Sequence, residues 1–132
     1  MTMKRELEGR NVLVVEDEYL LAECLSELLQ DQGAVVLGPA GSIESAFSLL
    51  SDAQLSEGLR PDAALLDVNV GGVAIDPVAD RLAQLNIPFM FTSGYDRSLA
   101  PSRHAHAPHC AKPFEPAQLM RSLVALVSPP RT

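Results

Sequence analysis

The chain has 132 residues, close to the roughly 150 of one typical domain and short for a two-domain enzyme. Hydrophobic residues make up 47% of it and charged residues 20%, which is typical of a globular domain and excludes a disordered or fibrous chain. Ten basic and 17 acidic residues give a net charge of −7, which disfavours nucleic acid as a direct ligand. We therefore expect one folded unit that does not bind DNA or RNA.

The two cysteines and the lengths of the apolar runs indicate the cellular compartment. Cys24 and Cys110 lie far apart in apolar stretches and match no metal-ligand spacing, so we expect small buried side chains in a reducing compartment. The first ten residues lack the apolar segment of a signal peptide, and no run approaches the roughly 18 apolar residues of a membrane span. These features predict a soluble cytoplasmic protein with no membrane partner.

Short apolar segments rich in β-branched residues alternate with stretches of helical periodicity, which predicts a parallel α/β sheet of five strands with five helices. The run NVLVV at 11–15 predicts a central strand buried on both faces. A helical stripe follows and ends near Gly33; its members are Leu20, Leu21, Cys24, Leu25, Leu28 and Leu29. We interpret this stripe first as core and second as a surface on which a kinase docks.

The middle of the chain continues the alternation. Residues 34–37 predict a second strand closed by Gly38-Pro39, and Ser42 is a candidate N-cap for the next helix. Residues 51–60 form a polar connection. The run AALL at 63–66 then predicts a third buried strand, which is followed directly by an aspartate.

The next segment starts with a turn, VNVGG at 68–72. Asp76-Pro77 has the chemistry of an N-cap followed by a first helical residue, for a helix through about Leu85. Residues 88–91 predict the fourth strand, and residues 93–95 its exit loop.

The last third of the chain departs from an even alternation. Residues 98–108 contain two prolines and little apolar periodicity, so we expect a weak or irregular fourth helix. Residues 109–111 predict a short fifth strand, and Pro116 opens a final helix. We expect an N-terminal tail at 1–9, one domain at 10–127 and a C-terminal tail at 128–132.

Polar residues follow four of the expected strands where each strand ends: Glu16 and Asp17, Asp67, Ser93, and Lys112. The carboxyl ends of parallel strands meet in one crevice, so these side chains are expected to form one site. Clustered carboxylates repel one another unless a cation joins them, and oxygen ligands suit Mg²⁺ or the similar Mn²⁺. A lysine and a hydroxyl beside the metal complete a phosphoryl pocket in which Asp67 is the natural covalent acceptor.

Four segments resemble, in order and approximate spacing, the motifs of response regulator receiver domains of two-component signalling: VLVVEDE at 12–18, ALLDVN at 64–69, PFMFTSGY at 88–95 and AKPF at 111–114. The resemblance covers residues 10–127. It implies a doubly wound, flavodoxin-like, five-stranded parallel sheet of order 2-1-3-4-5. It also implies phosphorylation by a sensor histidine kinase or a histidine phosphotransfer protein, and no enzymatic activity beyond the domain's own phosphorylation and dephosphorylation.

The resemblance assigns a role to each residue of the crevice. Asp67 would be the phosphoacceptor, and Lys112 would pair with the phosphoryl group. Asp17 and Asp67 would bind Mg²⁺ directly together with the backbone carbonyl of Asn69, while Glu16 would assist through a water molecule.

The switch hydroxyl of the family lies five residues after the start of the fourth strand, which selects Ser93 and leaves Thr92 as the fallback. The segment FTSGY also resembles the FATGY run of the stand-alone FAT GUY receivers, and this alignment again selects Ser93. Most receivers carry an aromatic switch residue three positions before the lysine, where this chain has His109. Asn69 and Tyr95 occupy positions that resemble those tuning hydrolysis of the phosphoryl group.

Two other departures from the family concern loops. Gly71-Gly72 stands in place of the usual proline after the phosphoacceptor, which indicates a more flexible loop. The weak fourth helix implies an output face that is absent or forms only on activation.

Three histidines in HAHAPH, at 104, 106 and 109, raise the alternative of a zinc or copper site. No acidic or thiol ligand is interleaved with them, so the preferred interpretation is a surface loop that contains proline.

The leading functional hypothesis is a single-domain response regulator that signals or buffers phosphate by contact with an unknown downstream protein, as a monomer or weak dimer. One alternative is a pseudo-receiver, a binding module that is never phosphorylated. Another is a phosphatase similar to the haloacid dehalogenases, because DVNV at 67–70 loosely resembles their motif. Asn69 stands where the second catalytic aspartate of that motif is required, so this alternative carries little weight.

Overall fold

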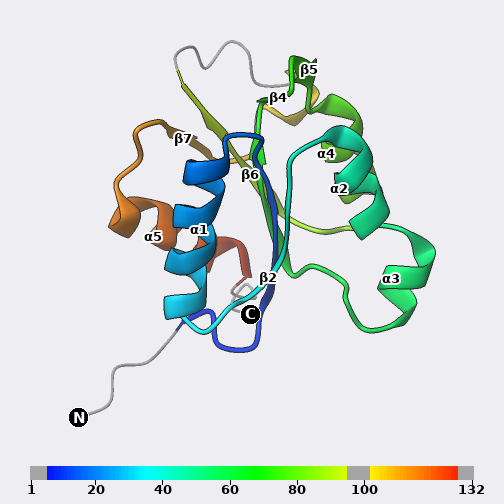
Figure 1. Ribbon diagram of the computed structural model, residues 1–132, viewed down its shortest axis with the longest axis horizontal. Helices are drawn as coiled ribbons and strands as arrows, with labels where there is room; N and C mark the ends of the chain where they lie inside the picture. Colours follow the sequence, from blue (N-terminus) through cyan, green and yellow to red (C-terminus); the bar gives the residue numbers. More distant parts are fainter. Residues whose placement is uncertain (1–5, 95–101, 128–132) are drawn as a thin grey trace.

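The computed structural model describes residues 6–94 and 102–127 (Figure 1). A five-stranded sheet in the order β2-β1-β3-β6-β7 forms its centre, and all neighbouring strands are parallel. The strands are β1 Asn11–Val15, β2 Val35–Ala40, β3 Ala63–Asp67, β6 Phe89–Ser93 and β7 His109–Ala111. Since β6 and β7 are the fourth and fifth strands of this sheet along the chain, the expected flavodoxin-like order 2-1-3-4-5 is confirmed.

Helices cover both faces of the sheet, as in a doubly wound fold (Figure 1). Helices α1 Tyr19–Asp31 and α5 Pro116–Val127 pack on one face, and α2 Ile43–Leu49 and α4 Asp76–Gln84 pack on the other. Within the described residues, no helix has both the length and the apolar character that crossing a membrane requires.

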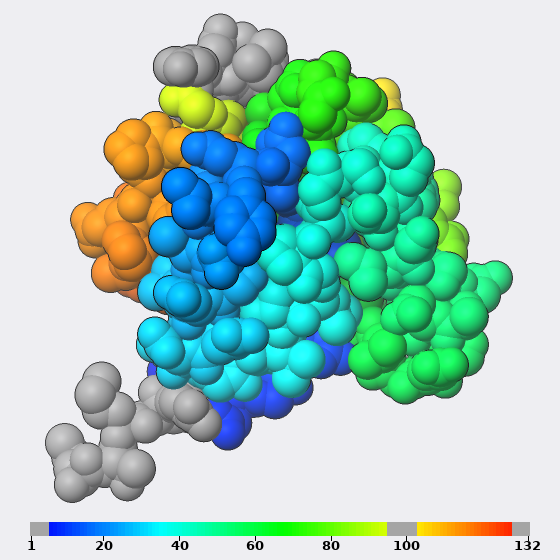
Figure 2. Space-filling view, viewed as in Figure 1, coloured from blue at the N-terminus to red at the C-terminus, as the bar shows by residue number. Residues whose placement is uncertain are grey.

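A small antiparallel hairpin follows β3, formed by β4 Asn69–Val70 and β5 Val73–Ala74. Its two turn residues, Gly71 and Gly72, have φ values of +59° and +80°. Positive φ at both central residues is typical of the type I′ turn that closes two-residue hairpins, so the glycines build a paired hairpin where a flexible loop was expected. In the space-filling view, residues near the start of α1 (blue) border the green segment that contains this hairpin (Figure 2).

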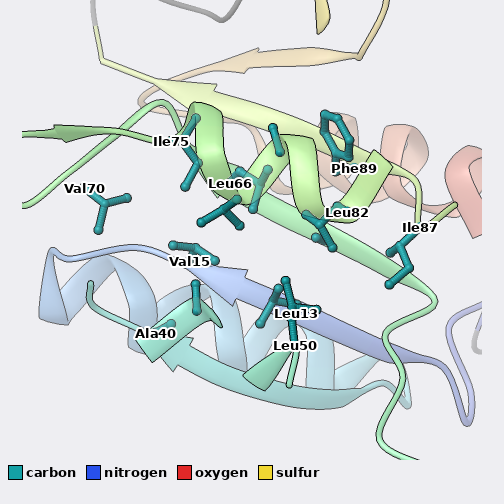
Figure 3. Packing of buried hydrophobic residues seen from close by; sticks show 14 of the residues in the cluster. Leu13, Val15, Ala40, Leu50, Leu66, Val70, Ile75, Leu82, Ile87 and Phe89 are labelled. Atoms are coloured by element: carbon teal, nitrogen blue, oxygen red, sulfur yellow. The ribbon is translucent and has the colours of Figure 1, made fainter. Parts of the chain in front are cut away.

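The core consists of two clusters, one on each side of the sheet. Successive residues of a strand point to opposite faces, so Leu13 packs in the cluster beneath α2 and α4 while Val12 packs in the cluster beneath α1 and α5. Figure 3 shows the first cluster, in which Val15 of β1, Leu66 of β3 and Ile75 before α4 come together. The strands that hold the crevice residues are thus fixed from both faces.

Several expected boundaries differ in the structure. The second strand does not close at Gly38-Pro39 but continues to Ala40, whose carbonyl accepts a hydrogen bond from the Glu16 N–H at 2.9 Å. The fourth strand extends past residue 91 to Ser93, because Thr92 and Ser93 both pair with β7. Ser93 therefore lies in the sheet and not in the expected exit loop.

Helix starts also differ in part. Ser42 caps α2 as expected, since its hydroxyl accepts the Ser45 N–H at 3.1 Å. The expected N-cap Asp76 is instead the first residue of α4, and Ile75 is the cap. The connection at 51–60 holds a short helix, α3 Asp52–Ser56, because the Ser51 hydroxyl accepts the Gln54 N–H.

The helical stripe of α1 is core only in part. Leu25 and Leu29 are buried, but Leu20 is 72% exposed and the Cys24 side chain is also exposed, so the expectation of a buried Cys24 was wrong. The stripe is wider than the sheet contact, and its outer edge faces solvent. Cys110 is buried in β7, as expected.

The chain around the expected fourth helix is described only from residue 102 onward, where it forms a single 3₁₀ turn, Ser102–His104. Residues 98–101 lie outside the described residues. At the other end of the chain, Leu7 belongs to the segment expected as a tail, yet it is fully buried in the cluster beneath α1 and α5.

Candidate functional site

Glu16, Asp17, Asp67, Ser93 and Lys112 lie at one edge of the sheet, where β1, β3, β6 and β7 end. The parallel register aligns these ends: Asp67 lies opposite Thr92, and Ser93 lies opposite Ala111. The Lys112 N–H continues the ladder by donating to the Ser93 carbonyl at 2.7 Å.

Three carboxylates form the acidic part of the site. Each of Glu16, Asp17 and Asp67 offers an oxygen, and these oxygens lie within 4.8 Å of one another. Glu16 and Asp67 are buried, at 3% and 8% exposure, whereas Asp17 is exposed. A set of oxygen ligands with one side open to water fits Mg²⁺, which binds few protein carboxylates and keeps several waters.

Lys112 lies between the two buried carboxylates. Its Nζ donates to Glu16 Oε1 at 2.9 Å and to Asp67 Oδ2 at 3.1 Å. Burial by itself lowers the pKa of Lys112, but the hydrogen bonds to both carboxylates and their negative charge outweigh it and raise the pKa above its usual range. The lysine therefore stays charged at neutral pH.

For Glu16, in contrast to Lys112, the effect of burial on the pKa is larger than that of the hydrogen-bond partners. Burial raises the pKa of Glu16 above its ordinary value, and the hydrogen bonds from Lys112 and from the Glu18 N–H only partly oppose this. The neighbouring Asp67 charge raises it further. Added positive charge near Glu16 would therefore favour its ionised form.

Both carboxylate oxygens of Asp67 have partners. Oδ2 accepts from Lys112, and Oδ1 accepts the Asn69 N–H at 3.3 Å. Asp67 ends a strand that is buried throughout, and these donors offset the cost of placing a carboxylate there. The side chain is held in one place at the mouth of the crevice.

Thr92 and Ser93 are both buried, but Ser93 lines the cleft beside Asp67. The Ser93 Oγ lies 2.5 Å from Nε2 of His109 on the adjacent strand. The structure therefore brings the expected switch hydroxyl and the expected switch position into direct contact. Tyr95, expected to tune hydrolysis, lies outside the described residues.

No family model matches the chain. Among curated proteins, the phyllosphere-induced regulator PhyR of Methylorubrum extorquens is 32% identical over 111 residues, which are 82% of this chain and 40% of PhyR. Among solved structures, SdrG of Sphingomonas melonis Fr1 is 34% identical, covers 91% of this chain and 98% of its own, and has a TM-score of 0.73. The chain belongs to the response regulator receiver domains.

A second solved structure, the receiver domain of the Erythrobacter litoralis response regulator PhyR, has a TM-score of 0.76 at 26% identity and covers 95% of this receiver domain and 98% of its own chain. The receiver domain spans about 40% of the length of PhyR from M. extorquens and 57% of the transcriptional regulator PdtaR of Mycobacterium tuberculosis, which is 27% identical.

A cleft of about 780 Å³ opens beside Asp67 and Lys112 in this receiver domain. Its apolar wall comes from α1 and from the loop after β7, and its residues are Leu21, Cys24, Pro113 and Phe114. This placement explains the exposure of Cys24, because the outer edge of α1 faces the cleft and not the sheet. Asp67 is itself among the residues that line this cleft.

A second polar cluster, on α4, was not predicted from the sequence. Asp80 accepts hydrogen bonds from Arg103 at 2.7 and 3.3 Å, and its Oδ1 lies 2.8 Å from Nε2 of His104. The hydrogen bond from Arg103, followed by the one from His104, lowers the pKa of Asp80. Nothing local in the sequence signals this cluster, because Asp80 lies 23 residues before Arg103.

His104 was expected in a surface loop, and the structure corrects this expectation. The side chain is buried, with its ring edge-on to Phe89 at 5.2 Å between centroids. Asp80 provides a hydrogen-bond partner for its ring nitrogen Nε2. His106, by contrast, is exposed.

Proposed function

We propose that the chain is a response regulator that accepts a phosphoryl group from a phosphohistidine onto Asp67, in a reaction that needs Mg²⁺ or Mn²⁺. One observation carries the proposal: a buried carboxylate at the end of a central strand, bonded to a lysine at 3.1 Å and within 4.8 Å of two further carboxylates. An aspartate that only forms a turn needs neither a buried position nor a lysine partner.

The donor set supports a divalent cation at the crevice. Asp17 and Asp67 would hold it directly with the backbone carbonyl of Asn69, and Glu16 would assist through water. The cation supplies positive charge that offsets the carboxylates and the incoming phosphoryl oxygens. The raised pKa of Glu16 is the cost of its burial as a carboxylate, which added positive charge relieves.

The transfer itself needs a nucleophile in line with the phosphorus. An oxygen of Asp67 supplies the electron pair of the new P–O bond, and the P–N bond of the donor breaks with its electrons remaining on the imidazole nitrogen, which takes a proton from solvent. Lys112 is already charged beside Asp67 and pairs with a phosphoryl oxygen. The protein therefore contributes position and charge and no further covalent step.

Ser93 and His109 would convert the modification into a structural signal. The Ser93 hydroxyl exchanges its contact with His109 for a hydrogen bond to a phosphoryl oxygen, which breaks the link between β6 and β7 at the switch position. Such a switch requires two conformations of similar free energy that phosphorylation biases. Asn69, two residues after Asp67, and Tyr95 would tune how long the phosphoryl group lasts.

The partner that donates the phosphoryl group would be a sensor histidine kinase or a histidine phosphotransfer protein in the cytoplasm. Tyr19 and Leu20, both exposed at the start of α1, and the apolar wall of the cleft offer it a contact surface. The output would be contact with an unknown downstream protein, or phosphate buffering, by a receiver domain whose motifs lie within residues 10–127 and which acts as a monomer or weak dimer. We propose neither nucleic acid nor membrane as a ligand.

The test is an intact-mass measurement after incubation with acetyl phosphate and Mg²⁺. Wild type is expected to gain one phosphoryl adduct, and this adduct is lost with a chelator or in Asp67→Asn. Asp31→Asn, a change at an exposed aspartate in the last turn of α1, is the control and keeps the adduct. An adduct on Asp67→Asn at wild-type stoichiometry would overturn the proposal. Absence of an adduct from acetyl phosphate and from a panel of phosphohistidine kinases would instead establish a pseudo-receiver.

A further inference from the structure

Asp17 differs from the other two carboxylates of the crevice because its side chain is exposed. Lys112 holds Glu16 and Asp67 from the protein interior. The Asp17 carboxylate accepts a hydrogen bond from the main-chain N–H of Gly71, with 2.8 Å between Oδ2 and the nitrogen. An exposed aspartate without such a contact would sample several rotamers, and ordering it on cation binding would cost conformational entropy.

The donor N–H lies at the tip of the β4–β5 hairpin, whose base is fixed in the core. Val70 and Ile75 are buried on either side of the turn, and both lie with Val15 in the cluster of Figure 3. The Ile75 N–H donates to the Val68 carbonyl at 3.1 Å and closes the base. The base of the hairpin is therefore fixed by packing in the core, and the hydrogen bond from Gly71 links its tip to Asp17, two residues before α1.

Glycine is required at the tip for its backbone conformation and not for space. Gly71 has φ of +59°, and a Cβ built on it would meet nothing within 4 Å. A β-branched residue strongly disfavours this φ, whereas asparagine adopts it readily in type I′ turns. Gly71→Val therefore disrupts the turn, whereas Gly71→Asn adds a side chain and preserves the turn.

We propose that Gly71 is a positioning residue for the cation site: its N–H holds one oxygen of Asp17 and leaves the other carboxylate oxygen for the metal. Charge-assisted hydrogen bonds of this kind are short and directional, and partners that orient a metal ligand typically change metal affinity by about 10- to 100-fold. The inference rests on the proposed function in one respect, since it takes Asp17 to be a ligand of Mg²⁺.

The experiment is a calorimetric titration of the folded chain with MgCl₂. Gly71→Val is expected to weaken Mg²⁺ binding by about 10-fold, and Gly71→Asn to stay within about twofold of wild type. Gly58→Val is the matched control: Gly58 also has a positive φ, of +80°, is exposed and has nothing within 4 Å of a built Cβ, but it follows α3, outside the crevice. Its Mg²⁺ affinity is expected to equal that of wild type.

The possible results distinguish a failure of the positioning role of Gly71 from a failure of the proposed function. If wild type binds no Mg²⁺, the proposed function loses its cation and the inference falls with it. If wild type binds and Gly71→Val, shown to be folded by circular dichroism, binds equally well, the positioning role alone is overturned. Equal losses in Gly71→Val and Gly71→Asn would also overturn it, because asparagine preserves the turn and its N–H.

A second variant covers the case in which Gly71→Val does not fold. Replacement of the amide between Val70 and Gly71 by an ester, through semisynthesis, removes the N–H and adds no side chain. The ester is expected to weaken Mg²⁺ binding by about 10-fold. Unchanged binding by the ester would overturn the inference.

Discussion

The hydroxyl of Ser93 and the imidazole of His109 face each other across β6 and β7, with 2.5 Å between Oγ and Nε2. Ser93 is buried, and among the described residues the imidazole of His109 is the side-chain partner of its hydroxyl. The contact holds the hydroxyl in place, and a phosphoryl group on Asp67 would have to compete with it.

Replacement of His109 by phenylalanine removes this competitor. A net hydrogen bond contributes about 1 kcal/mol, so His109→Phe is expected to speed phosphorylation by acetyl phosphate up to about fivefold. His109→Gln keeps a polar group near Ser93 and is expected to remain close to wild type. The rate is measured by intact mass over time at saturating Mg²⁺. The competition would be contradicted if acetyl phosphate modified His109→Phe more slowly than wild type and modified Ser93→Ala at the wild-type rate.

Lys112 has a structural role, because it is the lysine partner of the buried Glu16. Lys112→Met leaves Glu16 buried without its lysine partner, and an unpaired buried charged group costs about 1–3 kcal/mol or more. We expect a lower free energy of unfolding in urea without Mg²⁺, together with loss of the acetyl phosphate adduct. The double variant Glu16→Gln/Lys112→Met is expected to recover part of the stability, since it removes both charges. No recovery would show that the two side chains do not act as a pair.

The Asp80 cluster predicts a pH dependence of stability. The pKa of Asp80 is lowered below its ordinary 3.8 by Arg103 and then by His104. A depressed pKa in the folded state stabilises the fold above the unfolded value, and this contribution is lost as the pH falls through the folded value. The difference in unfolding free energy between wild type and Asp80→Asn is therefore expected to shrink as the pH falls below about 4.

Asp52→Asn is the matched control for this measurement. Asp52 also pairs with an arginine, with 3.5 Å to Arg81, but its side chain is 98% exposed. Exposed pairs contribute little, so the control is expected to follow wild type across the pH range. If Asp52→Asn and Asp80→Asn showed the same change in unfolding free energy, relative to wild type, as the pH falls, the effect could not be assigned to the Asp80 cluster.

His104 and His106 form a matched pair for testing burial. His104 packs on Phe89 and bonds to Asp80, while His106 is exposed. His104→Ala is expected to lower the free energy of unfolding by about 2 kcal/mol, and His106→Ala to change it by less than about 0.5 kcal/mol. Urea denaturation monitored by circular dichroism measures both. Equal effects would mean that the buried imidazole contributes no more than an exposed one.

The strand order and the position of the crevice were predictable from the sequence. Apolar runs that end abruptly in a polar residue mark buried parallel strands, and the carboxyl ends of such strands meet at one edge. That rule alone brings Asp67 near Lys112, although 45 residues separate them. The pattern is decisive because an ionised group at the end of a fully buried strand requires a partner.

Contacts that depend on how elements pack were decided by the tertiary structure. Whether Cys24 faces the sheet or the cleft depends on the rotation of α1 about its axis, and a wide apolar stripe permits several rotations. The pairing of Asp80 with His104 depends on where an irregular connection crosses α4. The contact between Asp17 and Gly71, 54 residues apart, exists because two glycines turn a hairpin toward α1, and periodicity carries no signal for the direction of a turn.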